Sequence, residues 1–301
     1  MFIYFSHELL FTFFFFIASY AVGIHPAMDK IIRSTHQSKK KLSGNSIKIL
    51  SWNIGKNKKS NWITEIFTLF HNHTPDILIL QEVKLEEKVK RVFNDKIFAW
   101  RFAPNLVHLK QQIFSGVLTA SEVLPNTEDF RHSESREPIT YTPKSTLFTT
   151  YPIDGTSKSL LVINIHGINF VSLKHFRSQI HEIIEHGQYH NGPIIFSGDF
   201  NTWNKNRIKF LEKILYRKLN LRAVSFERKH QKKIKKFMFS PPLDHIFYSY
   251  KQLKLVKNSS QVLRSYRSSD HKPILAEFKY ISETNHNSKS IAKKEEVLAI
   301  A

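Results

Sequence analysis

Short runs of apolar and β-branched residues, separated by turn-forming residues, recur along most of the chain. Such runs are typical of buried strands. They predict strands over residues 46–53, 76–83, 115–123, 145–153, 159–166, 193–200, 244–249 and 273–280. Between some of them the apolar residues follow a helical spacing, which predicts helices over residues 62–71, 173–184 and 206–217, the second with Ser172 as its N-cap. Many strands with few helices favour two packed sheets with helices outside them.

The N-terminal part of the chain departs from this pattern. Residues 9–24 form an apolar stretch, and a membrane span needs roughly 20 such residues, so the stretch is short for a span. Lysine and arginine residues follow it and do not precede it, which favours a cytoplasm-facing domain, soluble or N-terminally anchored, over a secreted one. Three interpretations stay open: a cleaved signal peptide, a short anchor, or an untranslated leader with Met28 as the true start.

These differences predict four parts. They are a hydrophobic leader over residues 1–27, a basic linker over residues 28–45, one large domain over residues 46–281 and a flexible tail over residues 282–301. The chain has no cysteine, which excludes disulfides, thiolate zinc sites and cysteine nucleophiles.

Positive charge is concentrated in one segment. The chain carries a net charge of +20, and residues 205–236 hold thirteen Lys or Arg against Glu212 and Glu227. A single charge run is often only a solvated helix face, but concentrated positive potential favours polyanionic partners. We expect nucleic acid to contact this segment. Membrane contact through residues 9–24 stays open, and no protein partner is predicted.

Polar residues with catalytic or metal-binding side chains stand where the predicted strands begin or end. They are Asn53, Glu82, His166, Asp199, Asn201, Asp244, Asp270 and His271. Any one of them alone is most simply a turn-forming or core residue. Strand ends of a layered sheet meet at one rim, however, so the whole set can converge. Carboxylate and amide oxygens suit Mg²⁺, and histidines beside carboxylates serve in phosphoester cleavage.

In this order the motifs SWNIG, LQEV, NIH, GDFN, LDHIF and SDHKPI resemble those of the endonuclease/exonuclease/phosphatase superfamily, whose fold is deoxyribonuclease-I-like. The stretches NIHGINF, REPITYTPKS and GPIIFSGDFNTW look most like its YafD-like bacterial branch. The resemblance covers roughly residues 46–281. It implies a four-layered α/β sandwich, in which two packed mixed β-sheets are flanked by helices, and hydrolysis of phosphoesters that depends on Mg²⁺ or Mn²⁺.

The same resemblance implies roles for the individual residues. Glu82 would be the principal metal ligand with Asn53 beside it, and Asp270 would complete the metal shell. His271, oriented by Asp244, would contact the phosphate or transfer a proton, and His166 would be the second histidine. Asp199 would orient or deprotonate the attacking water, and Asn201 would hold a phosphate oxygen. Which group is the general base stays open.

One position departs from the pattern. Some members of the superfamily, abasic-site endonucleases among them, carry an aspartate two residues after the first asparagine, where this chain has Gly55. That departure argues against abasic-site repair but not against catalysis.

We therefore expect a metal-dependent nuclease. One alternative is a phospholipid or inositol-phosphate phosphoesterase, similar to a sphingomyelinase, that acts at a membrane. A binding module on an inactive scaffold is the other, and the filled metal and histidine positions argue against it.

Overall fold

The computed structural model describes residues 23–27, 30–34, 36, 39–96, 98–138, 140–236 and 240–281. Most of the predicted leader and all of the predicted tail over residues 282–301 lie outside these ranges. Within the described ranges, no helix is both long and apolar enough to cross a membrane.

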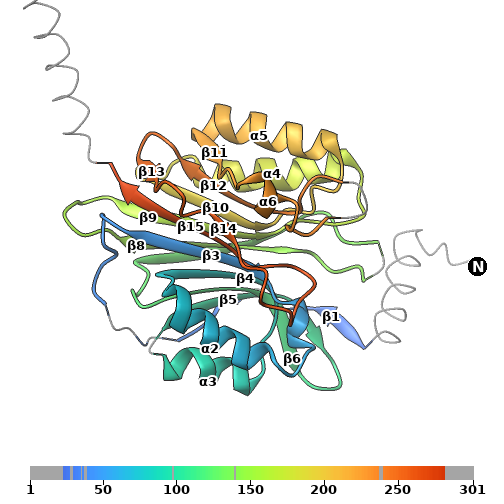
Figure 1. Ribbon diagram of the computed structural model, residues 1–301. Coiled ribbons are helices and arrows are strands. Elements are labelled where there is room, and N and C mark those ends of the chain that lie inside the picture. The colour runs from blue at the N-terminus through green and yellow to red at the C-terminus, as the bar shows by residue number, and fades with distance from the viewer. Residues whose placement is uncertain are drawn as a thin grey trace, which may run out of the picture.

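Two β-sheets form the body of the molecule (Figure 1). The first has the strand order β1-β5-β6-β4-β3-β15-β13, with β2 paired to β5 and β14 paired to β15. Its strands are β1 (Ile24–Pro26), β2 (Ile32–Arg33), β3 (Ile47–Asn53), β4 (Ile77–Lys84), β5 (Ala99–His108), β6 (Ile113–Ser121), β13 (Leu253–Leu255), β14 (Gln261–Val262) and β15 (Ile274–Tyr280). The second has the order β11-β12-β10-β9-β8-β7. Its strands are β7 (Thr127–His132), β8 (Ser145–Pro152), β9 (Ser159–His166), β10 (Ile194–Asp199), β11 (Leu221–Ala223) and β12 (Asp244–Ser249).

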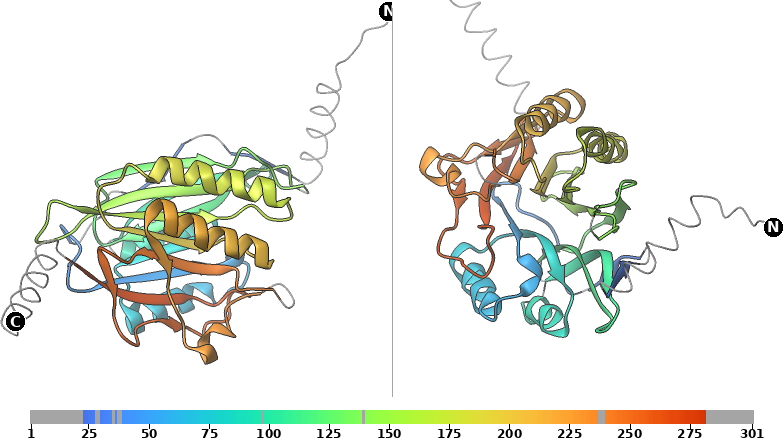
Figure 2. Two further views of the ribbon diagram at one scale, coloured as in Figure 1. Left: turned by 90° about the horizontal axis from the view of Figure 1, so that it is seen from above. Right: turned by 90° about the vertical axis from the view of Figure 1, so that its right-hand side faces the viewer.

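Two pairs of helices cover the outer faces of the sheets. Helices α2 (Trp62–His73) and α3 (Glu87–Asp95) lie on the first sheet, and α4 (Leu173–Gly187) and α5 (Lys205–Leu219) lie on the second. In the right-hand view of Figure 2, the two sheets face each other and lie between the two helix pairs. The short helices η1 (Gly55–Asn57) and α6 (Arg228–Gln231) lie in connections between strands.

The alternation of side chains along the strands explains the layers. In β3, Ile49 faces the core between the sheets while Leu50 packs toward α2 and α3. In β9, Val162 faces the core between the sheets while Leu161 packs toward α4 and α5. Successive side chains of a strand point to opposite faces, so strands that are apolar at every position must be covered on both sides. The predicted four-layered sandwich is confirmed.

The strand and helix predictions agree with the structure where the pattern was strong. All eight predicted strands are present, as β3, β4, β6, β8, β9, β10, β12 and β15, and the three predicted helices are α2, α4 and α5. Ser172 does stand at the N-cap of α4, but its side chain makes no capping hydrogen bond. The pattern missed β5 and α3, among other elements.

The segment predicted to be a linker over residues 28–45 is instead partly built into the fold. Strand β2 lies within it and pairs with β5, and β1, just before it, pairs with the same strand. Leu42 is buried and forms a β-bridge with Ile153 of the second sheet. Apolar residues among the lysines of this segment therefore pair with β5 and fill part of the core.

Candidate active site

The predicted site residues lie at one edge of the two facing sheets, where β3, β4, β9 and β10 have their carboxyl ends and the antiparallel strands β12 and β15 have their amino ends. Strand β3 runs parallel to β4, which places Asn53 beside Gln81 and next to Glu82. In the second sheet β9 runs parallel to β10 and β12 runs antiparallel to it. Strand pairing thereby sets His166, Asp199 and Asp244 side by side across three neighbouring strands.

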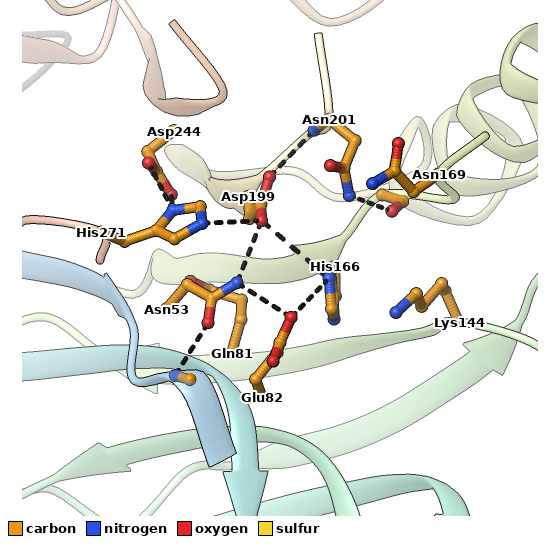
Figure 3. A network of polar contacts seen from close by, with 12 residues as sticks. Asn53, Gln81, Glu82, Lys144, His166, Asn169, Asp199, Asn201, Asp244 and His271 are labelled. Atoms are coloured by element: carbon orange, nitrogen blue, oxygen red, sulfur yellow. Dashed lines mark hydrogen bonds and ion pairs between the residues drawn. The ribbon is translucent and has the colours of Figure 1, made fainter. Parts of the chain in front are cut away.

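Asp199 lies at the centre of the cluster (Figure 3). Its Oδ2 accepts a hydrogen bond from Asn53 Nδ2 at 3.0 Å, and the same oxygen lies 3.9 Å from His166 Nε2 and 3.8 Å from His271 Nε2. Its Oδ1 accepts the backbone N–H of Asn201 at 3.0 Å. Burial raises the pKa of this carboxyl group, against the lowering effect of His271. One buried carboxylate of the second sheet thus contacts Asn53 of the first sheet and lies near both histidines.

The two histidines are held in opposite states of charge. Nδ1 of His271 lies 2.9 Å from Asp244 Oδ2. Burial lowers the pKa of His271, but the charge and hydrogen bond of Asp244, together with Asp199, outweigh burial and raise that pKa to about 10. Burial, aided by Lys144, holds the pKa of His166 well below its usual range. At neutral pH the site therefore has an imidazolium donor on one side of Asp199 and a neutral imidazole on the other.

Glu82 reaches the cluster from an interruption in β4. The pairing of β4 with β6 shifts register between Leu80 and Val83, and Glu82 there has the left-handed φ of 51°. Its Oε1 lies 3.5 Å from Asn53 Nδ2 and 3.8 Å from His166 Nε2. The bulge turns this carboxylate out of the alternation of the strand and toward the other sheet.

Asn201 follows β10 in a left-handed conformation with φ 52° and donates from Nδ2 to the Gly167 carbonyl at 2.8 Å. The loops after β9 and β10 touch closely here, since a Cβ at Gly167 would lie 2.5 Å from the carbonyl oxygen of Phe200. Only glycine fits, so the backbone itself fixes Asn201 next to His166.

Asp270 is the one predicted site residue whose side chain does not join the cluster. Its carboxylate is 67% exposed and pairs with Lys235 Nζ at 2.6 Å. Partial burial raises its pKa, but the hydrogen bond to Lys235 and the charge of His271 bring that pKa below the usual value. The metal-ligand role predicted for Asp270 has no support in this arrangement.

The departure at Gly55 has a local explanation. Gly55 has φ 58° and donates its N–H to Asn53 Oδ1 at 3.0 Å. A left-handed turn at this point favours glycine and orients the Asn53 amide so that Nδ2 faces Asp199.

A cavity of about 350 Å³ opens beside the cluster, and its lining includes residues without an individually predicted role, although Lys235 belongs to the basic segment over residues 205–236. Lys56, Lys144 and Lys235 line it together with Asn169 and Phe170. Lys144 lies in the stretch REPITYTPKS that carries part of the family resemblance, but no role was predicted for it, and Lys56 lies in η1 with no spacing in common with it. Asn169 and Phe170 follow His166 closely and belong to the stretch NIHGINF that carries part of the family resemblance, but no role was predicted for them.

The residues present fit a divalent cation with oxygen ligands. Glu82 and Asp199 offer carboxylate oxygens at the cavity, and the Asn53 carbonyl oxygen keeps a second lone pair. One atom each of Asp199, Asp244 and His271 also lie within 4.8 Å of one another. In this second set of residues, Asp244 and His271 are already hydrogen-bonded to each other. Glu82 with Asn53 is therefore the better candidate for a cation site.

Comparison with known proteins adds a family to this geometry. The family model described as endonuclease/exonuclease/phosphatase family matches residues 50–271. A UPF0294 protein of Vibrio parahaemolyticus is 34% identical over 233 residues, which are 77% of this chain and 77% of that protein. A UPF0294 protein of Erwinia tasmaniensis is 31% identical over 254 residues, covering 83% of this chain and 86% of that protein.

Solved structures share the fold at low sequence identity. The human Nocturnin catalytic domain with bound sulfate anion aligns with a TM-score of 0.59 at 17% identity, covering 85% of this chain and 99% of that chain. TDP2 from Caenorhabditis elegans aligns with a TM-score of 0.55 at 17% identity, covering 79% of this chain and 75% of that chain. These likenesses show the architecture alone.

Proposed function

Because the chain belongs to the endonuclease/exonuclease/phosphatase family, in its YafD-like bacterial branch, we propose that it is a divalent-metal-dependent nuclease. Members of the family are hydrolases that act on phosphoester bonds. The finer proposal is that this chain hydrolyses phosphodiester bonds of nucleic acid, with Mg²⁺ or Mn²⁺ as the cation.

One observation carries the proposal. The buried Asp199 carboxylate lies between an imidazolium and a neutral imidazole, on the wall of a cavity that three lysines also line. The carboxylate and the neutral imidazole suit the activation of water, and the imidazolium and the lysines suit the negative charge of phosphates. A chain of phosphodiesters presents several such charges in a row, and the separate lysines match it better than they match a single phosphate.

The cation supplies charge stabilisation for the phosphate when it is bound by Glu82 and Asn53. The remaining work belongs to the side chains of this protein. Asp199 Oδ2, with His166 beside it, orients the attacking water and takes its proton as the new phosphorus–oxygen bond forms. The phosphorus–oxygen bond to the leaving strand breaks, and the leaving oxygen takes a proton from Nε2 of His271. Asp244 holds His271 charged and aimed for that transfer, and Asn201 helps to position a phosphate oxygen.

A substrate panel tests the proposal. Purified protein is incubated with Mg²⁺ or Mn²⁺ and, separately, with EDTA, using plasmid, linear duplex, single-stranded DNA, RNA, and vesicles of phospholipids and phosphoinositides. We expect cleavage of at least one nucleic acid that requires the metal and is lost in a Glu82→Gln variant purified in the same way. Intact nucleic acids in every metal-containing reaction would refute the nuclease.

The lipid alternative is tested in the same panel. Among the described residues, the large apolar side chains that are clearly exposed are Tyr141, Phe170, Tyr189 and Tyr216, which lie in different parts of the sequence and form no apolar hairpin. Phosphate release from lipid vesicles without nucleic-acid cleavage would replace the nuclease by a lipid phosphoesterase that uses the same cluster.

The nucleic-acid contact predicted for residues 205–236 remains a proposal. Lys235 of this segment lines the cavity, whereas α5 at its start lies in the outer layer over the second sheet. We propose that the polyanion enters past Lys56, Lys144 and Lys235, with α5 as a more distant contact.

A further inference from the structure

Phe170 is a large apolar residue that the fold keeps at the surface of the catalytic cavity. It lies in the loop between β9 and α4, four residues after His166, and 60% of it is exposed. It lines the same cavity as His166 and Asp199. A single exposed aromatic ring is ordinary on a protein surface, but this one lines the catalytic cavity and is therefore available to contact a ligand there.

The backbone of Phe170 has an uncommon conformation, and hydrogen bonds to its loop hold it there. Phe170 has the left-handed φ of 52°, which a bulky residue rarely adopts. Its N–H donates to Asn169 Oδ1 at 2.9 Å. Below the loop, the buried Arg207 guanidinium donates to the carbonyls of Ile168 at 3.1 Å and Val171 at 2.6 Å. Contacts on both sides of Phe170 therefore fix the backbone that presents its ring.

A second aromatic residue stands on the neighbouring loop. Tyr141 is 42% exposed and also has a left-handed φ, of 49°. It follows Thr140, which lines the cavity. The Tyr141 ring lies against the Arg136 guanidinium, with Cζ 5.4 Å from the ring centroid, and Phe170 is the residue that brings an aromatic ring to the cavity that Lys56, Lys144 and Lys235 also line.

Aromatic rings next to lysines match the two chemical parts of a nucleotide. A nucleobase stacks on an aromatic side chain, while lysines neutralise the phosphates on either side of it. A cavity of about 350 Å³ is at the small end of ligand pockets and has room for one nucleotide, not for a duplex. A base within a continuous duplex already has both faces stacked, so only an unpaired or terminal base can lie on Phe170.

Resting on the proposed nuclease function, we propose that Phe170 is a stacking platform for the nucleobase next to the phosphodiester that is cut. The site consequently selects unpaired nucleotides, in single strands or at frayed ends, over continuous duplex.

Two variants at Phe170 test this assignment. Phe170→Leu keeps an apolar side chain and the same backbone constraint but removes the π face, and Phe170→Trp enlarges that face. Tyr189→Leu is the matched control, since Tyr189 is 85% exposed and lies beyond the opposite end of α4. The substrates are a single-stranded oligonucleotide with one preferred cleavage position, the same strand with an abasic unit beside that position, and the corresponding duplex.

For the normal strand we expect Phe170→Leu to raise KM on the order of tenfold with little change in kcat, since stacking contributes to binding. Phe170→Trp should match or improve the wild-type KM, and Tyr189→Leu should be unchanged. On the abasic strand, the wild type and Phe170→Leu should have the same KM, because the base that stacks on the ring is missing. The preference of the wild type for single strand over duplex should narrow in Phe170→Leu.

Three results would overturn the assignment. One is a KM of Phe170→Leu for the normal strand equal to that of the wild type. Another is an equal rise in KM on the normal and the abasic strand, which would mean that Phe170 has a structural role. The third is an unchanged oligonucleotide KM with lost activity on phospholipid vesicles, which would assign the ring to a lipid surface. Failure of the nuclease proposal is distinguishable, because the wild type itself would then cleave no nucleic acid.

Discussion

At the scale of single residues, Glu82 combines a strained backbone with a partly buried carboxylate at the cavity. Its φ of 51° lies in a region that costs a residue with a long side chain on the order of 1 kcal/mol or more. The Asn53 amide nitrogen contacts the carboxylates of both Glu82 and Asp199, so the two negative groups lie close to each other. Both features weaken the folded state without a cation, and both bring the carboxylate to the cavity.

We therefore predict that Glu82→Asn stabilises the metal-free protein by about 1 kcal/mol while it abolishes activity, because asparagine tolerates left-handed φ and carries no charge. Urea unfolding in EDTA gives the free energy, and Glu82→Gln is the control that removes the charge but keeps the strain. A Glu82→Asn variant less stable than Glu82→Gln would contradict the strain at this position.

Asp244 sets the charge of His271, and this predicts a pH effect of known sign. Asp244→Asn removes the carboxylate that favours the imidazolium, so the pKa of His271 should fall from about 10 toward or below its ordinary value. Activity that depends on the imidazolium should then be lost at a lower pH than in the wild type. Histidine NMR titration in EDTA measures the shift.

The control for this titration is Asp129→Asn, since Asp129 pairs with the more exposed His186 at 3.2 Å, away from the cluster. It should leave the His271 titration unchanged. A His271 pKa that stays near 10 in Asp244→Asn would show that Asp199 alone charges the ring.

The sequence was sufficient for site residues whose direction is set by strand pairing. His166, Asp199 and Asp244 are brought together by register, because the last residues of β9 and β10 lie beside the first residue of the antiparallel β12. Asp270 could not be placed in this way, since Lys235, 35 positions away, draws its carboxylate outward. Phe170 was also missed, because a single exposed aromatic residue in a loop forms no pattern.

At the scale of elements, Arg207 joins helix α5 to the loops that carry the site. This side chain is fully buried and donates to the carbonyls of Ile168, Val171 and Asn201. Its Cζ also lies over two aromatic rings, 4.7 Å from the centroid of the Phe176 ring and 4.6 Å from that of the Trp203 ring. Burial lowers its pKa to about 10, so it stays charged at neutral pH.

Arg207→Met should destabilise the protein by about 3 kcal/mol, because three buried carbonyls lose their donor. Arg207→Lys should recover part of that loss, since an ammonium can reach fewer of the carbonyls at once. Thermal and urea unfolding measure both variants. A loss below about 0.5 kcal/mol in Arg207→Met, the range of ordinary surface changes, would contradict this role.

Elements with mixed patterns were the ones that the sequence did not predict. Strand β5 contains Pro104, and its pairing with β6 shifts register between Pro104 and Leu106. Proline commonly argues against an interior strand, and the bulge is what accommodates it. Helix α3 buries Val89, Val92 and Phe93 at helical spacing, but it has only nine residues and most of the others are charged or polar. Such elements depend on the sheet against which they pack.

At the scale of the whole molecule, each of the two sheets brings one histidine and at least one carboxylate to a cavity lined by lysines. Electrostatic binding of a polyanion at such a cavity releases counterions and so weakens with salt. Lys56→Gln should lower the slope of log affinity against log salt by about 0.7 for a single strand, if Lys56 contacts one phosphate.

The control is Lys254→Gln, an exposed position on β13, which should leave the slope unchanged. Lys213→Gln on the exposed side of α5 tests the contact predicted for residues 205–236 and should lower the slope only if that helix is reached. Fluorescence anisotropy with a labelled strand and the inactive Glu82→Gln protein gives these slopes. An unchanged slope in Lys56→Gln would contradict entry of the strand past this residue.

The most direct measurement of the central claim is single-turnover cleavage of a labelled single-stranded oligonucleotide with Mg²⁺ by wild type, Asp199→Asn and Asp129→Asn. Asparagine keeps the shape of Asp199 and one of its two acceptor oxygens but cannot take the proton of water. We predict a loss of about 10³-fold or more in Asp199→Asn, with normal folding and an unaffected Asp129→Asn. Wild-type cleavage by a folded Asp199→Asn variant would contradict the claim that this cluster is one hydrolytic site.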